Sequence, residues 1–174
     1  GMRGVVVDLA DRVAVAQLVA DAPELLDGPL TTVVHTAAVL ALGPVADIDD
    51  DEWDRLLAVN LTATMALLRA ASGMLADGGS ITVVSSNSAA VPRIGIGAYG
   101  ATKAAVSNLV RSTGLELAVR AVRCNIITPG STDTAMLHSM WPEAVPPEQS
   151  AEAVIAGTPE QFRLGIPLGR LAQP

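Results

Sequence analysis

Three side chains that can do acid-base chemistry stand in the segment 85–106, which is otherwise made mostly of Ala, Gly, Val and Ile. These are Ser86, Tyr99 and Lys103. Tyr99 and Lys103 share one face if the segment is helical, while Ser86 ends the preceding apolar run. A tyrosine hydroxyl, whose ordinary pKa is about 10, becomes a useful acid or base when a neighbouring cation favours the phenolate. Lys103 can supply that cation and Ser86 can hold the reacting oxygen, although a packed tyrosine beside a solvated lysine fits this spacing equally well.

The composition of the 174-residue chain favours a single globular domain over residues 1–174, because half of its residues are hydrophobic. The net charge of -7, with no basic cluster, argues against nucleic acid as a partner. The one cysteine, Cys124, permits no internal disulfide, and no apolar run approaches the ~20 residues that span a bilayer. The start lacks the regions of a signal peptide, and Gly1 and Met2 look like a tag remnant. We therefore expect a cytoplasmic protein that takes a small-molecule substrate and has no membrane partner.

The elements that must position these side chains follow from short apolar runs that alternate with longer helical patterns. The expected strands cover residues 4–8, 31–38, 80–86 and 122–130, and read as strands covered on both faces. The expected helices cover residues 11–22, 49–75 and 97–120. This order predicts an α/β fold with a doubly wound, Rossmann-like parallel sheet, which binds ligands at the carboxyl ends of its strands. The Pro-rich stretch 141–154 predicts an irregular or mobile loop.

The spacing of Ser86, Tyr99 and Lys103 resembles the catalytic pattern of the short-chain dehydrogenase/reductase family, and the resemblance extends over essentially the whole chain. It implies that Tyr99 is the catalytic acid/base, that Lys103 lowers its pKa and binds the nicotinamide ribose, and that Ser86 orients the substrate oxygen. Asn60 corresponds to the family's fourth catalytic residue. Helical spacing also places Asn60 on an apolar stripe, where its amide needs partners. We favour an anchor for a relay water leading to Lys103 over a purely structural amide.

The same resemblance implies NAD as the cofactor, with NADP not excluded, and no metal. Segment 127–134 is similar to the family segment that holds the nicotinamide carboxamide and the phosphates. Asp8 matches an acidic residue beside the adenine, and also suits a helix cap. The small side chains after the second expected strand permit close approach of the cofactor. The expected cofactor contacts are Asp8, Ala37, Ala38, Pro129, Gly130, Ser131, Thr132 and Thr134.

Two features depart from the family pattern. His35 stands where the family has an asparagine, and we interpret it as a structural residue without a chemical role. The sequence also shows no equivalent of the first βαβ unit with its Gly-rich turn, nor of the last strand, so that only strands 3 to 6 of the family order 3-2-1-4-5-6-7 are expected. We therefore expect a partial fold that binds NAD weakly, with displaced or disordered residues along the edge at 31–36.

Within the family, the segments 86–105 and 123–136 resemble members that oxidise a ring hydroxyl of a cyclic dihydrodiol carboxylate in catechol siderophore biosynthesis. Such an anion needs a local cation, and Arg93 is the nearest candidate, although a solvated loop arginine fits equally well. The resemblance alone adds Met136 and Gln161, in a substrate-loop region over 135–165. Two alternatives stay open: a reductase of another cyclic alcohol or ketoacyl substrate, and a non-catalytic remnant that acts by association.

The expected helices around Asn60 and after Tyr99 carry more apolar surface than one sheet face should cover. Family members pair these two helices between subunits. The resemblance therefore implies a homodimer or homotetramer.

Overall fold

The computed structural model describes residues 3–174, and the interpretation of Gly1 and Met2 as a tag remnant falls outside the described residues. Its centre is a three-stranded parallel sheet in the order β1-β2-β3, formed by Thr32–His35, Ser80–Val84 and Arg123–Ile127. Val33, Ile81 and Cys124 are in register across the sheet. The α/β class with a parallel sheet follows the expectation from the sequence. Each strand ends earlier than its apolar run, because the residues after it already form the loops of the site.

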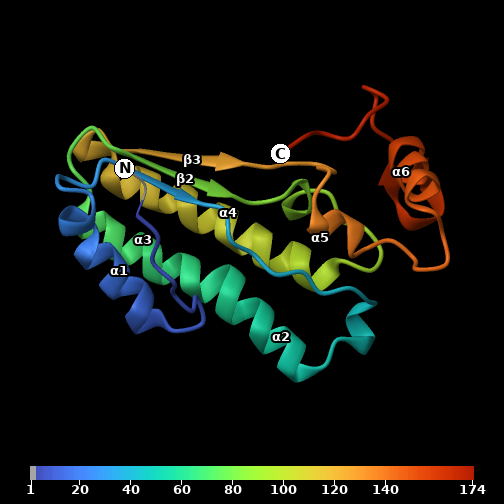
Figure 1. Ribbon diagram of the computed structural model, residues 1–174, viewed down its shortest axis with the longest axis horizontal. Coiled ribbons are helices and arrows are strands. Elements are labelled where there is room, and N and C mark those ends of the chain that lie inside the picture. Colours follow the sequence, from blue (N-terminus) through green and yellow to red (C-terminus); the bar gives the residue numbers. More distant parts are fainter. Residues whose placement is uncertain (1–2) are drawn as a thin grey trace.

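The helices that connect the strands lie on one face of the sheet, as Figure 1 shows for α1, α3 and α4. They are α1 (Arg12–Leu25), α2 (Asp50–Leu56), the π-helical turn η2 (Leu57–Thr62), α3 (Ala63–Met74) and α4 (Gly97–Leu117). Short 3-10 turns, η1 (Val45–Asp47), η3 (Asn87–Ala89) and η4 (Ala118–Arg120), join them to their neighbours. The core forms where α3 and α4 pack on the strands, around Leu68, Leu75, Ile81, Val106 and Val110.

The opposite face of the sheet carries exposed residues, which corrects the expectation of strands covered on both faces. Val34 and Ile127 are about half exposed there, at 61% and 50%. The expected strand over residues 4–8 is also wrong, since those residues follow an extended path without strand pairing. A strand needs a hydrogen-bonded neighbour, and among the described residues no strand pairs with this segment.

The run from Asp50 to Met74 forms one continuous helical rod, which by length and composition alone is long and apolar enough to cross a membrane. That corrects the expectation that no apolar run approaches such a length. Leu56, Asn60, Thr64 and Leu68 are all buried within the protein, on the stripe expected from their spacing. A helix with one face packed in this way behaves as a core helix.

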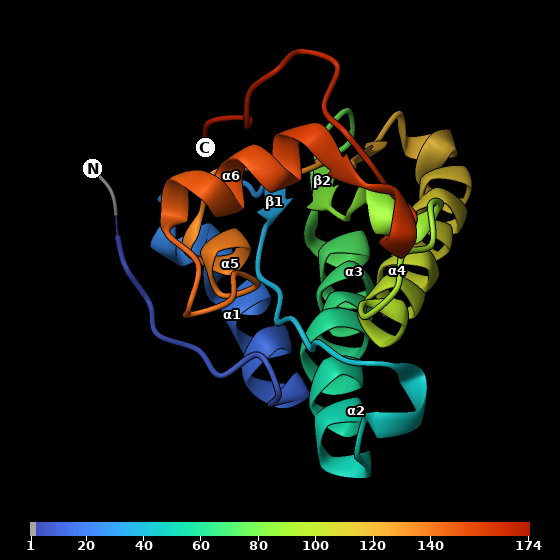
Figure 2. The ribbon, with the colours of Figure 1, turned by 90° about the vertical axis from the view of Figure 1, so that its right-hand side faces the viewer.

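The region after β3 is more ordered than its Pro-rich sequence suggested. It contains α5 (Ala135–His138), α6 (Pro147–Ala156), the turn η5 (Pro159–Gln161) and a small antiparallel pair, β4 (Gly157–Thr158) with β5 (Arg163–Leu164). The loop expected over 141–154 is therefore partly helical, because Pro146 and Pro147 occupy the N-cap and first turn of α6, where proline is tolerated. Figure 2 shows α5, α6 and the C-terminal segment gathered at one end of the molecule.

Candidate active site

Ser86, Tyr99 and Lys103 come together where β2 ends. Lys103 lies one turn after Tyr99 on α4, and its Nζ donates to the carbonyl oxygen of Val84, the last residue of β2, at 3.0 Å. Ser86 follows two residues later as the N-cap of η3. Tyr99 and Lys103 are both buried, and Nζ is 5.7 Å from the centroid of the phenol ring. The strand end and the helix start thus hold a hydroxyl, a phenol and an amine at one edge of the sheet.

Burial dominates the acid-base properties of this group. It lowers the pKa of Lys103 to about 8. It also raises the pKa of Tyr99, while the interaction with the Ser86 hydroxyl acts in the opposite direction. The lowering of the Tyr99 pKa expected from Lys103 is therefore not found in this arrangement, because both groups lose hydration together.

The backbone of Lys103 is fixed by two serines that sequence reasoning missed. Ser85 and Ser107 both donate to the Lys103 carbonyl oxygen, at 3.0 and 2.8 Å, and their hydroxyls lie 2.7 Å apart. Ser107 stands four residues after Lys103, so its spacing could have indicated this contact. The two hydroxyls anchor α4 to the end of β2, which limits movement of the lysine relative to the strand.

Asn60 links α4 to the loop after β1. Its Oδ1 accepts from the Val39 N–H at 2.8 Å, and its Nδ2 donates to the Val39 carbonyl at 2.9 Å and to Thr102 Oγ1 at 3.1 Å. Protein groups thus use both amide hydrogens. Asn60 lies within the π-helical turn η2, whose wide spacing is marked by the bond from the Ala63 N–H to the Ala58 carbonyl. The side-chain amide thus acts as a clamp, in the sense that it holds Val39 of the loop and Thr102 of α4 together. Its role as a water anchor stays a prediction.

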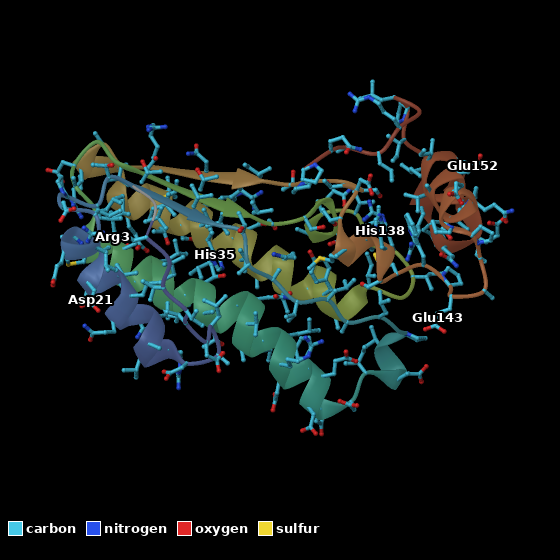
Figure 3. The ribbon with its side chains drawn as sticks, viewed as in Figure 1. Arg3, Asp21, His35, His138, Glu143 and Glu152 are labelled. Carbon is cyan, nitrogen blue, oxygen red and sulfur yellow. The ribbon has the colours of Figure 1, made fainter. Side chains whose placement is uncertain are left out.

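His35 extends this network from the end of β1, beneath the sheet in Figure 3. Its Nε2 lies 3.1 Å from Thr64 Oγ1, and that hydroxyl donates to the Asn60 carbonyl at 2.7 Å. Because the hydroxyl has one hydrogen, it must accept from His35, which fixes the neutral tautomer with hydrogen on Nε2. Burial, and then the charge of Lys103, lower the pKa of His35. The structural interpretation of His35 agrees with these contacts.

The residues expected to contact a cofactor lie in two loops and in the N-terminal segment. Ala37 and Ala38 are half-buried after β1, while Pro129 and Gly130 follow β3, where the Pro129 carbonyl accepts from the Asn87 N–H at 3.0 Å. A side chain at Gly130 would meet Asn87 Nδ2 at 3.4 Å. The small residue at 130 therefore lets the loop after β3 approach Asn87 closely.

The hydroxyl residues after Gly130 also have structural contacts. The Ser131 carbonyl accepts from the Ala172 N–H at 3.1 Å, and Thr132 forms a β-bridge to Ala172. Thr134 is the N-cap of α5. Asp8 is exposed and accepts from the Ala10 N–H at 2.9 Å, whereas Asp11 caps α1. The alternative interpretation of Asp8 as the helix cap is therefore wrong, because Asp11 stands directly before the first helical turn.

The residues expected at the substrate lie around the same end of the sheet. Arg93 donates from Nη1 to Asn87 Oδ1 at 2.8 Å, so its guanidinium contacts the residue that follows Ser86 in the sequence. Gln161 ends η5, and its carbonyl accepts from the Ile94 N–H at 3.3 Å. Met136 lies on α5 with about a third of its surface exposed. The structure thus brings the segments of Arg93 and Gln161 together.

The sequence model of the short chain dehydrogenases matches residues 2–144, and therefore covers the whole group around Tyr99. The chain belongs to the short-chain dehydrogenase family. Among curated relatives, the chain is 41% identical over 175 residues to the 2,3-dihydro-2,3-dihydroxybenzoate dehydrogenase of Escherichia coli, covering 97% of the chain and 67% of the relative. It is 40% identical to the protein of the same name from Bacillus subtilis, covering 96% and 63%.

A solved short-chain dehydrogenase/reductase from Serratia marcescens superposes with a TM-score of 0.79 at 29% identity, over 97% of the chain and 63% of that structure. A dehydrogenase/reductase from Sinorhizobium meliloti gives 0.77 at 31%, over 96% and 60%. The chain thus spans roughly two thirds of the length of the short-chain dehydrogenases that it matches. Within the part of the fold that the chain shares with these structures, the parallel sheet and the helices on its one face correspond to a Rossmann-type fold.

Proposed function

We propose that this protein oxidises a ring hydroxyl of 2,3-dihydro-2,3-dihydroxybenzoate with NAD, after which the ketone tautomerises to the catechol acid of siderophore biosynthesis. The observation that carries the proposal is the 40–41% identity to relatives of that name over nearly all of this chain. The arrangement of Ser86, Tyr99 and Lys103 supports it, because it supplies a donor, a base and a cation at one edge.

Ser86 serves as the donor to the reacting oxygen. Its Oγ accepts from the Ser88 N–H at 3.1 Å and from the Ser88 hydroxyl at 2.8 Å. Both bonds use oxygen lone pairs, so the single hydrogen of Ser86 is left to donate to the Tyr99 oxygen or to the reacting oxygen. A hydroxyl oriented in this way by its neighbour binds the substrate oxygen in a defined direction.

Tyr99 takes the hydroxyl proton of the substrate, and Lys103 stabilises the phenolate that precedes this transfer. The raised pKa of Tyr99 disfavours the phenolate in the arrangement described here. We assign Lys103 to this role because a cation favours a phenolate that forms beside it in a partly dehydrated site. Lys103, with a pKa of about 8, carries its charge at neutral pH.

Bound NAD would supply the acceptor for the hydride of the ring carbon. We assign Ala37, Ala38, Gly130 and the donors after them to the nicotinamide half of such a cofactor, because small side chains at the carboxyl edge of a parallel sheet permit close approach of a ligand. Ser131 and Thr132 are the side chains that we assign to its polar groups, together with Asp8 at the adenine. In support of a nicotinamide cofactor, a solved neighbour with 28% identity and a TM-score of 0.76 is a complex with NADPH. We favour NAD over NADP.

We also propose that two copies associate through the outer faces of α3 and α4. A groove of about 510 Å³ runs there between Leu61 of η2 and Met65 on one side and Ala105 and Leu109 on the other, and Arg12 and Arg69 also line it. Met65 is 39% exposed in the single chain. Exposed apolar surface of this kind favours a symmetric dimer, or a tetramer built from dimers. We propose the cytoplasm as the location of the protein.

The test is a set of initial rates with the dihydrodiol acid and with cyclic alcohols and ketoacyl compounds that lack its carboxylate, each with NAD and with NADP. We expect the highest kcat/KM for the acid with NAD. Ser86→Ala should lower kcat on the order of 10²-fold, as loss of a donor to a reacting oxygen does. Ser72→Ala, which removes a hydroxyl that donates to the Leu68 carbonyl of its own helix, is the matched control. A higher kcat/KM for a ketoacyl or another cyclic substrate would replace the proposal by the reductase alternative, and no turnover of any of them would favour the non-catalytic one.

A further inference from the structure

Arg93 and Arg163 approach each other although 70 positions separate them in the sequence. Arg93 lies in the loop before α4, and Arg163 begins β5. The backbone bond from Ile94 to Gln161, at 3.3 Å, joins their two segments. Burial, and then the charge of Arg163, lower the pKa of Arg93, which agrees with the approach of the two segments. Among residues 3–174, neither arginine forms a salt bridge with a carboxylate.

The hydrogen-bond capacity of the two guanidinium groups is largely unused. Arg93 has one side-chain bond, from Nη1 to Asn87 Oδ1. Arg163 Nε is buried and has no partner within the described part of the chain. A buried donor without a partner is costly, and two adjacent cations without an anion are costlier still. The planar donor forks of two arginines match the oxygens of one carboxylate.

The backbone around Arg163 is closely packed, which favours a built site over an accidental approach. Gly157 precedes it with a φ of +88°, and a Cβ there would come within 2.4 Å of the Gly165 nitrogen. The two glycines therefore let the end of α6 and the start of β5 pack backbone against backbone. The β4–β5 pair then fixes the residue from which the guanidinium extends.

We propose that Arg93 and Arg163 together bind the carboxylate of the substrate, and that Arg163 is the part of this subsite that sequence reasoning did not find. The inference rests on the proposed function for the identity of the anion. The position of the bound carboxylate follows from Asn87. The side chain of Asn87 accepts from Arg93, and its backbone N–H donates to the Pro129 carbonyl. Asn87 is also the residue next to Ser86. A ring acid bound by both arginines thus lies at the rim of the group that holds the reacting oxygen.

The experiment measures binding without turnover, using benzoate and benzamide as a charged and an uncharged ring probe. We expect benzoate to bind the protein more tightly than benzamide, by calorimetry. Arg163→Gln and Arg93→Gln should each weaken benzoate on the order of tenfold to hundredfold and leave benzamide within about threefold. Arg163→Lys, which keeps the charge but not the fork, should give an intermediate loss. Arg170→Gln, an exposed arginine of the same C-terminal segment, is the matched control.

The double variant adds a test of shared binding. Because both arginines hold one carboxylate, the loss in Arg93→Gln/Arg163→Gln should be clearly different from the sum of the single losses. An unchanged benzoate affinity in Arg163→Gln, or equal losses for benzoate and benzamide, would overturn the inference. If the benzoate pattern holds while the dihydrodiol acid is not oxidised, the proposed function fails and the anion subsite stands.

Discussion

Replacing Lys103 by methionine should remove a large part of the pH dependence of stability between neutral and alkaline pH. The side chain is 3% exposed, and burial lowers its pKa from 10.5 to about 8. A basic group whose pKa is lower in the folded protein than in the unfolded chain stabilises the fold most at a pH above its pKa in the unfolded chain. That stability is lost as the pH falls through the folded value, because the unfolded chain then binds the proton more readily.

The size of this effect follows from the shift. At about 1.36 kcal/mol per pKa unit, the titration of Lys103 should raise the free energy of unfolding by about 2.5 kcal/mol between about pH 7 and pH 10. In Lys103→Met that rise should be missing. The variant also leaves the Val84 carbonyl without its partner, which costs about 1–3 kcal/mol, but this cost is the same at every pH.

Urea unfolding of both proteins at several pH values over this range measures the difference directly. The range stops near pH 10 because the pKa of Tyr99 is raised in the folded protein, so the stability that Tyr99 contributes begins to fall once the pH rises above its unfolded value of 10.0. Lys103→Met/Tyr99→Phe compared with Tyr99→Phe serves as the control for coupling between the two groups. Equal pH slopes in wild type and Lys103→Met would refute the reasoning, because the ammonium would then be hydrated in the folded protein.

Three further predictions concern the supporting network and the surface. His35→Gln should make the protein less sensitive to acid. The pKa of His35 lies below 6.5 in the folded chain, so the stability that its neutral ring contributes is complete above pH 6.5 and is lost as the pH falls. In urea unfolding at mildly acid pH, the free energy of unfolding should therefore fall less in the variant than in wild type. Asn60→Ala should lower the free energy of unfolding by about 2–4 kcal/mol, because the Val39 and Thr102 groups lose their partners; a loss below about 0.5 kcal/mol in urea unfolding would contradict the clamp. Met65→Lys should shift the protein toward monomer in sedimentation equilibrium at micromolar concentration, whereas a wild-type protein that is already monomeric would exclude the proposed dimer.

The helices and the parallel strands could be predicted from the sequence because their signals are local. Helical spacing puts Tyr99 and Lys103 on one face, and the run of apolar residues around Ile81 marks a buried strand. The segment 4–8 has the same apolar, β-branched character, yet it forms no strand. Strand formation depends on a neighbour, and the composition of a segment carries no information about its neighbours.

The contacts that complete the site could not be predicted because they join distant segments. Asn60 could be placed on a buried stripe, but its partner Val39 lies in a loop whose path depends on the whole fold. The sequence around Arg163 gives no signal of a contact with Arg93. Only the pairing of β4 with β5 and the bond from Ile94 to Gln161 bring it to Arg93.

The proposed chemistry is tested most directly by the rate of hydride transfer in a single turnover of Tyr99→Phe compared with wild type. The phenylalanine keeps the buried ring and removes only the hydroxyl. We expect wild type to form the reduced cofactor and the catechol acid together, and the variant to be slower on the order of 10²–10⁴-fold or more with little change in substrate affinity, because acid-base catalysis is lost. Hydride transfer in Tyr99→Phe within about tenfold of wild type would contradict the role of Tyr99 and the account built on it.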